Sequence, residues 1–279
     1  MSTIHLDVAG RRSATTEPGY RVSAGRVIRS EWTKFCSVRS PAITLLVALI
    51  LTIGLGAIIS AVAAAHYGDL SSGDKASFNP ISASLAGFSF SNLALGVLGV
   101  LVITGEYATG TVRASFTAVP KRLPVLYGKI VVTAAVTFVV MLVASLASFF
   151  IGQALLSSHQ LDVSLSSSTA VRSVVGAALA VSVIATFGLA LGALLRNTAA
   201  SITIFVAIFF VVAPLLSLLP GSIADSITPY LPSDAVTVLF DRDPTDLHAL
   251  QPWTGFAVFC GYTAIVVAAA AWRIRTTDA

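Results

Sequence analysis

Six long segments without a single Lys, Arg, Asp or Glu restrict this chain more than any other feature of its sequence. They are residues 42–65, 81–104, 130–156, 173–195, 198–219 and 253–272. Each reaches the roughly 20 residues that an α-helix needs to cross about 30 Å of hydrocarbon. Within lipid the backbone must satisfy its own hydrogen bonds, and segments of this length do so as helices. The sequence therefore predicts an all-α integral membrane protein with six transmembrane helices in a domain over 41–272.

The overall composition supports a membrane protein and argues against a soluble domain. Hydrophobic residues make up 56% of the chain and charged residues only 11%, whereas a soluble domain has roughly 25% charged residues. Cys36 and Cys260 are too few and too isolated for a disulfide framework or a metal site. We therefore expect both cysteines to be small packing residues.

The first forty residues predict a cytoplasmic tail followed by a helix at the membrane surface. Residues 1–40 lack the continuous apolar core of a secretory signal peptide, and 1–20 have the composition of a disordered segment. Over 22–40 an apolar stripe recurs with helical spacing at Ile28, Trp32 and Phe35, and the charged side chains lie off it at Arg29, Glu31 and Lys34. We expect Trp32 and Phe35 to lie at the membrane–water interface. The alternative is an ordinary solvated helical linker.

The distribution of basic residues predicts the orientation of the chain. With six spans both termini lie on one side, together with 105–129 and 196–197. That side carries fourteen of the 17 basic residues: Arg11, Arg12, Arg21, Arg26, Arg29, Lys34, Arg39, Arg113, Lys121, Arg122, Lys129, Arg196, Arg273 and Arg275. The positive-inside rule places this side, including the tail 273–279, in the cytoplasm. Trp253 and Trp272, at the two ends of the last span, are expected at the two interfaces of the membrane.

The sequence contains no motif that predicts catalysis by this chain. A phosphate-binding loop, a G-x-S-x-G elbow and an H-E-x-x-H pair are all missing. The histidines fall outside the spans, and no Lys, Arg, Asp or Glu lies within the six segments. Intramembrane ionisable residues are the usual mark of ion-coupled transport. We therefore expect no catalytic, cofactor or metal site, and we expect any work across the membrane to draw its energy from another protein.

The polar stretch 105–129, GEYATGTVRASFTAVPKRLPVLYGK, separates the second and third segments and carries a basic surplus. Residues 108–118 predict a short helix along the membrane surface, ended by Pro120. A rigid charged helix between two spans would move both of them when a partner pushes it. The alternative is a loop anchored to anionic lipid headgroups by Lys121, Arg122 and Lys129.

Several stretches together resemble the integral-membrane subunit of bacterial ABC-2 type transporters. They are 30–40 (SEWTKFCSVRS), 96–129, 189–198 (LALGALLRNT) and 252–275, and the run GEYATGTVR at 105–113 is the most specific of them. The resemblance implies two six-helix subunits, as a homodimer or heterodimer, around a path, with separate ATP-binding cassette subunits docked from the cytoplasm. It also implies that 22–39 is a connecting helix and that 220–252 contributes short external or re-entrant helices. An ATPase domain, present in fused members of the family, is missing here.

The resemblance implies an exporter in the bacterial plasma membrane that is driven by a partner's use of ATP and Mg²⁺. It implies that a coupling helix between the second and third spans meets the ATPase through Glu106, Tyr107, Thr109, Gly110, Thr111 and Arg113. We expect Arg113 to pair with an acidic residue of the ATPase. We expect Glu106 to pair with a basic residue there or to cap a helix N-terminus. Membrane lipid is a further partner, and nucleic acid is not.

Two buried amides are candidates for lining a path, and two other functions remain open. Asn92 and Gln153 lie inside predicted spans, where an amide needs a hydrogen-bonding partner. The glycines in the spans are better explained by helix packing. One alternative function is a membrane scaffold or regulatory subunit that docks a cytoplasmic partner without transporting anything. The other is a lipid-modifying membrane enzyme, which the lack of a convergent catalytic set disfavours.

Overall fold

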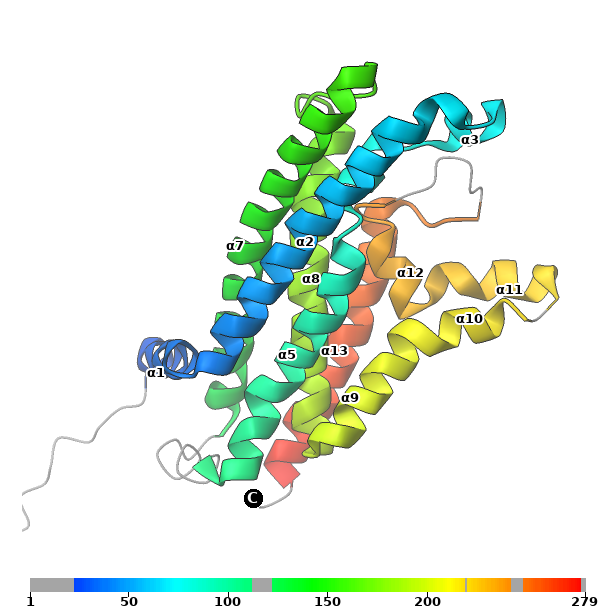
Figure 1. Cartoon of the computed structure of the whole chain (residues 1–279). Helices are drawn as coiled ribbons and strands as arrows, with labels where there is room; N and C mark the ends of the chain where they lie inside the picture. The colour runs from blue at the N-terminus through cyan, green and yellow to red at the C-terminus, as the bar shows by residue number, and fades with distance from the viewer. Residues whose placement is uncertain (1–22, 112–121, 219, 242–247, 277–279) are drawn as a thin grey trace, which may run out of the picture.

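Every regular element in the described part of the chain is helical. The computed structural model describes residues 23–111, 122–218, 220–241 and 248–276. Six helical stretches in these ranges are long and apolar enough to cross a membrane. They are α2 (Arg39–His66), α5 (Phe88–Thr109), α7 (Leu123–Leu156), α8 (Ser168–Leu195), α9 (Thr198–Val206) continued through η3 (Ala207–Val211) and α10 (Val212–Leu216), and α13 (Pro252–Thr276). The six-span, all-α prediction is thus confirmed by length and composition (Figure 1).

Short helices occupy the chain ends and connections of this bundle. The helix α1 (Ala24–Ser37) lies across one end of the bundle, next to the start of α2 (Figure 1). The link between α2 and α5 contains η1 (Tyr67–Asp69), α3 (Ser72–Ser77) and α4 (Pro80–Leu85), and η2 (Ser157–His159) follows α7. Between α10 and α13 lie α11 (Gly221–Ile227), η4 (Thr228–Tyr230) and α12 (Pro232–Thr237).

The helix α8 forms the centre of the bundle. Its apolar stretch is 83% buried, compared with 22% for α2 and 17% for the α9–α10 stretch. It packs against α5, α7 and α13, mostly through small side chains such as Ala177, Ala178, Ala185 and Ala190. Small residues let membrane helices approach closely, and dispersion attraction between the closely packed atoms replaces the hydrophobic effect that lipid cannot supply.

Three glycines allow α5 and α8 to pack closely along a seam where their backbones touch. A Cβ added at Gly99 would overlap the carbonyl oxygen of Ala185, and one at Gly188 would overlap the carbonyl oxygen of Gly96. Gly96 also faces the ring of Phe205 from α9, with no room for a side chain of its own. These glycines are therefore positions of backbone contact between helices, which supports their expected role in packing.

The prediction that 81–104 crosses the membrane as a single helix is wrong. The structure divides it into α4 and α5, with a break at Ala86 and Gly87. Asn79 caps α4 by accepting from the backbone N–H groups of Ile81 and Ser82, and Pro80 occupies its first turn. Gly87 lies directly against the backbone of Thr52 in α2, where a Cβ would overlap. The break therefore brings this part of the chain into contact with α2.

The predicted boundaries around 105–129 are also wrong. The helix α5 continues to Thr109 instead of ending at 104, and α7 begins at Leu123 instead of 130. Glu106 and Lys129 thus belong to long helices and not to a connecting loop. The prediction ended the helices where charge appears, whereas a helix continues past that point when its charged side chains find partners.

The fifth span is interrupted one turn before Pro214. Over Ala207–Val211 the backbone forms a π-helix. A proline lacks the N–H that would bond to the carbonyl four residues earlier, and its ring displaces that carbonyl. For Pro214 that carbonyl belongs to Phe210, so the irregularity falls one turn upstream of the proline.

The apolar piece in the long connection 220–252 packs inside the protein. Ala235, Val236, Leu239 and Phe240 are buried. A Cβ at Gly176 of α8 would lie 2.7 Å from the Cγ of Leu239, and one at Gly255 of α13 would lie 2.5 Å from Val238 Cγ1. Glycine at these two positions therefore lets the segment that follows α12 rest on α8 and α13.

We predict that Gly99→Ala destabilises the bundle by about 1–3 kcal/mol, because a methyl group forces α5 away from α8. Gly54→Ala in α2 is the matched control, since a Cβ there meets nothing within 4 Å. Thermal unfolding in a mild detergent compares the two variants. A Gly99→Ala protein as stable as Gly54→Ala would contradict the close seam.

Candidate functional site

The helix α1 buries one face against the bundle, and this face includes an acidic residue. Ser23 caps its N-terminus by accepting from the backbone N–H of Arg26, and the extended conformation of Val38 ends it. Its buried residues are Val27, Glu31 and Phe35. Glu31, which the sequence places off the apolar stripe, is only 3% exposed, so the prediction that it lies on the polar side of α1 is wrong. Trp32, from the expected stripe, is 51% exposed.

A glycine in α7 lets α1 approach closely enough to bury that face. A Cβ added at Gly128 would lie 3.0 Å from Val27 Cγ1 and 3.6 Å from Glu31 Cγ. The neighbouring residue Lys129 is therefore brought beside the carboxylate of Glu31. This pairing joins two residues that are 98 positions apart in the sequence.

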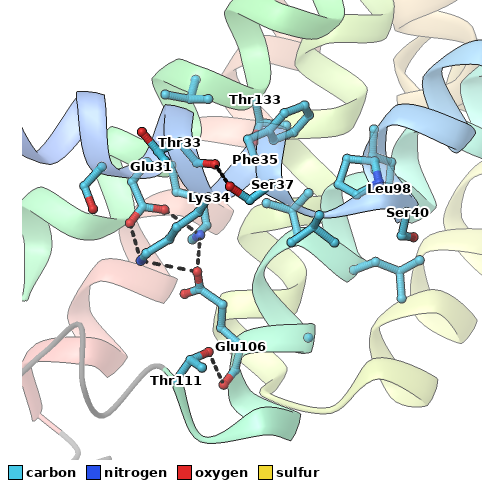
Figure 2. A pocket seen from close by; sticks show the side chains of 18 of the residues that line it. Glu31, Thr33, Lys34, Phe35, Ser37, Ser40, Leu98, Glu106, Thr111 and Thr133 are labelled. Atoms are coloured by element: carbon cyan, nitrogen blue, oxygen red, sulfur yellow. Dashed lines mark hydrogen bonds and ion pairs between the residues drawn. The ribbon is translucent and has the colours of Figure 1, made fainter.

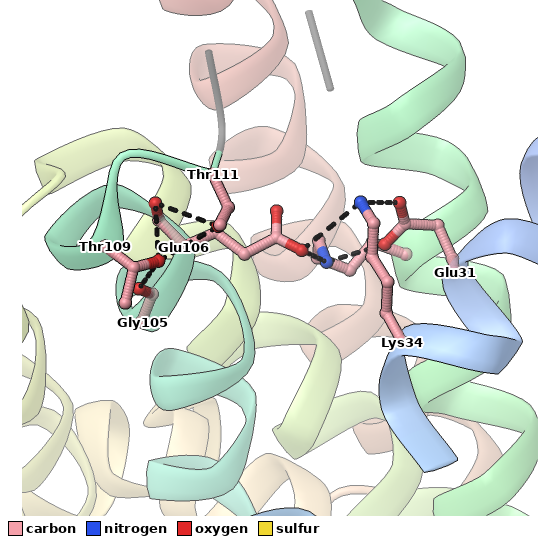
Figure 3. A network of polar contacts seen from close by, with 7 residues as sticks. Glu31, Lys34, Gly105, Glu106, Thr109 and Thr111 are labelled. Atoms are coloured by element: carbon pink, nitrogen blue, oxygen red, sulfur yellow. Dashed lines mark hydrogen bonds and ion pairs between the residues drawn. The ribbon is translucent and has the colours of Figure 1, made fainter. Parts of the chain in front are cut away.

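Four charged side chains from three helices form a closed ring, which we call the charge ring. Lys129 Nζ of α7 lies 2.6 Å from Glu31 Oε2 of α1 and 2.8 Å from Glu106 Oε1 of α5. Lys34 Nζ of α1 lies 2.6 Å from Glu31 Oε1 and 3.4 Å from Glu106 Oε1. Each ammonium group thus contacts both carboxylates, and Figure 3 shows Glu106 reaching from the end of α5 toward α1.

Burial makes the charge ring sensitive to the loss of any member. The side chains of Glu31 and Lys129 are only 3% and 6% exposed, that of Glu106 is 16% exposed and that of Lys34 is 36% exposed. A buried charge is tolerated only when opposite charges and hydrogen bonds surround it. With two positive and two negative members in alternation, the ring is neutral and each charge has two opposite neighbours.

The charge ring also keeps Lys34 protonated. Burial by itself lowers the pKa of this lysine, but the hydrogen bond to Glu31 and the charges of Glu106 and Glu31 outweigh it and raise the pKa above 10.5. A raised lysine pKa gives a stabilisation that is complete below the ordinary value and is lost as the pH rises through the folded-state value. The positive charge of Lys34 therefore persists throughout the physiological range.

The structure describes five of the six residues expected to couple to a partner, and it places three of them in α5 and not in a separate short helix. Glu106, Tyr107 and Thr109 lie in the last turn of α5, and Gly110 ends the helix in the left-handed conformation with φ 71°. The short helix expected over 108–118 is therefore wrong at its start, and 112–118, with Arg113, lie outside the described residues. Glu106 stands at the C-terminus of α5, and its carboxylate pairs with Lys34 and Lys129 of this chain; a helix N-terminus that it was expected to cap would lie outside the described residues.

A second set of contacts ties the same end of α5 to α8 and α13. The guanidinium of Arg196 lies 5.5 Å from the centre of the Tyr107 ring, a cation–π contact. Arg196 follows the last turn of α8 in the left-handed conformation, with φ 55°. Arg273 of α13 donates to the carbonyl oxygen of Leu194. The end of the bundle that carries the charge ring is thus cross-linked through all of its central helices.

A cavity of about 780 Å³ opens beside the charge ring, between α1, the start of α2, α5 and α7. Its apolar wall is formed by Phe35, Val38, Pro41, Leu98, Leu101, Val102 and Val132. All four members of the charge ring also line it, together with hydroxyl side chains. Figure 2 shows Glu31, Lys34 and Glu106 on one side of the cavity and Leu98 on the other.

The remaining predicted site residues lie away from this cavity, with the exception of Phe35. Trp253 and Trp272 are 57% and 69% exposed near the two ends of α13. The amide of Gln153 is occupied: Nε2 donates to Pro80 O and Ser84 Oγ, and Oε1 accepts from the Val163 N–H. This gives Gln153 a structural role in fixing α4 and the chain after α7. Asn92 is buried, and among the described residues its Oδ1 has no hydrogen-bond partner.

Sequence reasoning missed the roles of Glu31 and Lys129. Lys129 was expected either to sit in a polar segment or to bind lipid headgroups, and the structure instead buries it against two carboxylates. One signal could have pointed to these residues. Glu31 is the only acidic residue between 18 and 68, and Glu106 is the only one between 75 and 161. Lone carboxylates on a strongly basic side of a membrane protein are candidates for internal pairing.

The chain matches no protein-family model and no curated protein. Among the described residues there is also no group of three or more His, Cys, Asp or Glu side chains that could hold a metal ion. A functional interpretation therefore starts from the charge ring, the cavity beside it and the sequence of 105–113.

We predict that Lys129→Met destabilises the protein by about 3–5 kcal/mol, because it leaves Glu31 buried with only Lys34 as a partner. Lys34→Met should lower the stability less, since that side chain is 36% exposed. Adding Glu31→Gln to Lys129→Met should recover part of the loss, because the unpaired buried charge is then removed.

Thermal unfolding of the three variants in mild detergent is the measurement that compares them. Equal losses for Lys34→Met and Lys129→Met, or no recovery in the double variant, would contradict a ring whose stability depends on buried pairing.

Proposed function

We propose that this chain is the membrane-spanning permease subunit of an ABC-2 type transporter, and that it exports its cargo. In this proposal two permease copies form the path, and a separate ATP-binding cassette subunit docks at the end of the bundle that carries the charge ring. That end faces the cytoplasm of a bacterial cell, with both termini on the same side. The proposal combines the sequence resemblance with one structural observation.

That observation is the position of the charge ring relative to 112–121. The ring takes Glu106 from the last turn of α5, before this segment, and Lys129 from the second turn of α7, after it. Its other two members come from α1. A displacement of the segment between α5 and α7 would therefore act on three helices at once. This is the mechanical property that a coupling segment requires.

The apolar spans support an external source of energy. The charged residues of α5 and α7 are Glu106, in the last turn of α5, and Lys129, in the second turn of α7, and they neutralise each other in the charge ring. Proton or ion relays instead place ionisable groups along the path. In the proposed cycle, ATP binding closes the partner's two ATPase units and moves 105–122 of each permease. The bundle follows only to the extent that the partner binds one arrangement better than the other.

The surface of α1 fits a connecting helix that lies on the membrane. Trp32 is 51% exposed and Ile28 is 38% exposed, so apolar groups remain on the side of α1 that faces away from the bundle. Trp at such a position is typical of the membrane–water interface. The exposed Trp253 and Trp272 fit the two opposite interfaces in the same way.

The direct experiment is purification of the chain from its native membrane together with its partners. We expect a protein with a phosphate-binding loop and no membrane span to co-purify in stoichiometric amount. We expect the complex in liposomes to hydrolyse ATP and to accumulate cargo on the side away from the charge ring. Stoichiometric binding without transport would instead identify a scaffold or regulatory subunit, and a chain that moves cargo without any nucleotide-hydrolysing partner would overturn the proposal.

We predict that Arg113→Ala and Glu106→Gln each lower permease-dependent ATP hydrolysis by the complex severalfold, without preventing membrane insertion. Arg113→Ala removes the expected contact with the partner, and Glu106→Gln loosens the connection between α5 and α7. The matched control is Lys75→Ala, which changes a basic residue in the link between α2 and α5. Unchanged hydrolysis rates in both variants would contradict the assignment of 105–113 as the coupling segment.

A further inference from the structure

The cavity beside the charge ring has the two-part lining of a site for an amphiphile. Apolar side chains such as Leu98, Leu101 and Val132 form one wall, and the charge ring closes the other end. Its volume of about 780 Å³ falls within the range of about 300–1,000 Å³ that is typical of ligand pockets. The cavity is partly open and lies at the end of helices that are apolar enough to cross a membrane.

A buried hydroxyl in the cavity lacks a hydrogen-bond partner. Thr133 is fully buried and lines the cavity, and within the described residues its Oγ1 makes no hydrogen bond. One turn later Thr137 donates to the carbonyl of Thr133, as hydroxyls in helices usually do. A buried hydroxyl without a partner costs free energy, so its place in the lining of a cavity calls for a polar atom of a bound molecule or water to satisfy it. This orphan group is the second observation that points to a ligand.

The charge ring determines which headgroup fits. Its longest edge joins Lys34 and Glu106 at 3.4 Å, and these are also its two most exposed members. An anionic headgroup at this edge would contact Lys34 but would also face the carboxylate of Glu106. A cationic headgroup would meet the reverse conflict with Lys34. A zwitterion offers its anion to Lys34 and its cation to Glu106, so neither side chain loses a partner.

We propose that this cavity binds a zwitterionic phospholipid from the leaflet that borders α1. The phosphate contacts Lys34, the ammonium contacts Glu106, and one acyl chain runs along Leu98, Leu101 and Val132. A polar group near the glycerol reaches the hydroxyl of Thr133. The bound lipid thereby bridges α1 to α5 at the open edge of the charge ring. This proposal depends on the chain being a membrane protein and is independent of its assignment as a transporter.

Direct binding of single-chain probes tests the headgroup requirement. The full chain is purified in a maltoside detergent and titrated with a lysolipid that carries phosphoethanolamine. Two parallel titrations use the phosphoglycerol lysolipid, which is anionic, and an alkyltrimethylammonium of the same chain length. We expect one zwitterionic molecule per chain by native mass spectrometry and a rise in the melting temperature, because a ligand of the folded state stabilises it. Equal effects of all three probes would overturn the proposal.

A cavity-filling variant tests the location. Gly105 lines the cavity, and a Cβ there meets nothing within 4 Å, so the side chain of Gly105→Leu starts in open space at the cavity wall. We expect at least about tenfold weaker lysolipid binding, since the added side chain occupies the volume of the ligand. Gly261→Leu in α13 is the matched control, because its Cβ is equally unobstructed and it lies outside the cavity. Wild-type affinity in Gly105→Leu would overturn the proposal.

Thr133→Val provides a second variant that does not depend on filling the cavity. Removing an unpaired buried hydroxyl should leave the lipid-free melting temperature unchanged or higher, while the loss of one hydrogen bond to the ligand weakens binding about fivefold. A purely structural role for Thr133 predicts a change in stability without a change in binding.

Lipid extraction from purified wild-type protein, Gly105→Leu and Gly261→Leu identifies the native occupant. Retention of a zwitterionic phospholipid by wild type and Gly261→Leu, and its loss from Gly105→Leu, supports the assignment, whereas equal amounts in all three contradict it.

Discussion

Charge can be buried at the end of an apolar helix bundle only when opposite charges and hydrogen bonds surround it, and here the charge ring meets this requirement. Glu31 and Lys129 are almost completely buried, so each depends on the other and on Glu106 and Lys34. The ring thereby fixes how α1 lies across the bundle and how far α5 and α7 extend beyond their apolar parts. It is the polar connection that joins α1, α5 and α7 where these three helices converge.

The centre of the bundle depends on close packing and not on charge, because α8 packs there through small residues. Gly99 and Gly188 bring the backbones of α5 and α8 together, and the Tyr107–Arg196 contact continues this connection to the end that carries the charge ring. Close packing resists small deformations, so motion at one end of such helices is transmitted along them. The combination of a polar connection at one end and a close seam along the length is suited to rigid-body movement of the bundle.

The sequence was sufficient to predict six spans, because their length and lack of charge leave a helix as the only stable form in lipid. It did not reveal the break between α4 and α5, since Gly87 is required only by its contact with Thr52. It did not reveal the pairing of Glu31 with Lys129 either, because that depends on how α1 lies on α7 at Gly128. Both features result from contacts between segments that are far apart in the sequence. The helical periodicity of one segment carries no information about such contacts. The resemblance singled out 105–113 as a candidate coupling segment, but nothing in the sequence indicated the cavity beside it.

The claim on which this account depends most is that the end of the bundle that carries the charge ring faces the cytoplasm, where a nucleotide-hydrolysing partner is available. Single-cysteine accessibility tests it, in a protein whose native Cys36 and Cys260 are replaced by Ser. Thr111→Cys, next to the exposed end of α5, should react with a membrane-impermeant maleimide in inside-out vesicles but not in intact cells. Ser72→Cys in α3 should show the opposite pattern. Labelling of Thr111→Cys in intact cells would contradict the account.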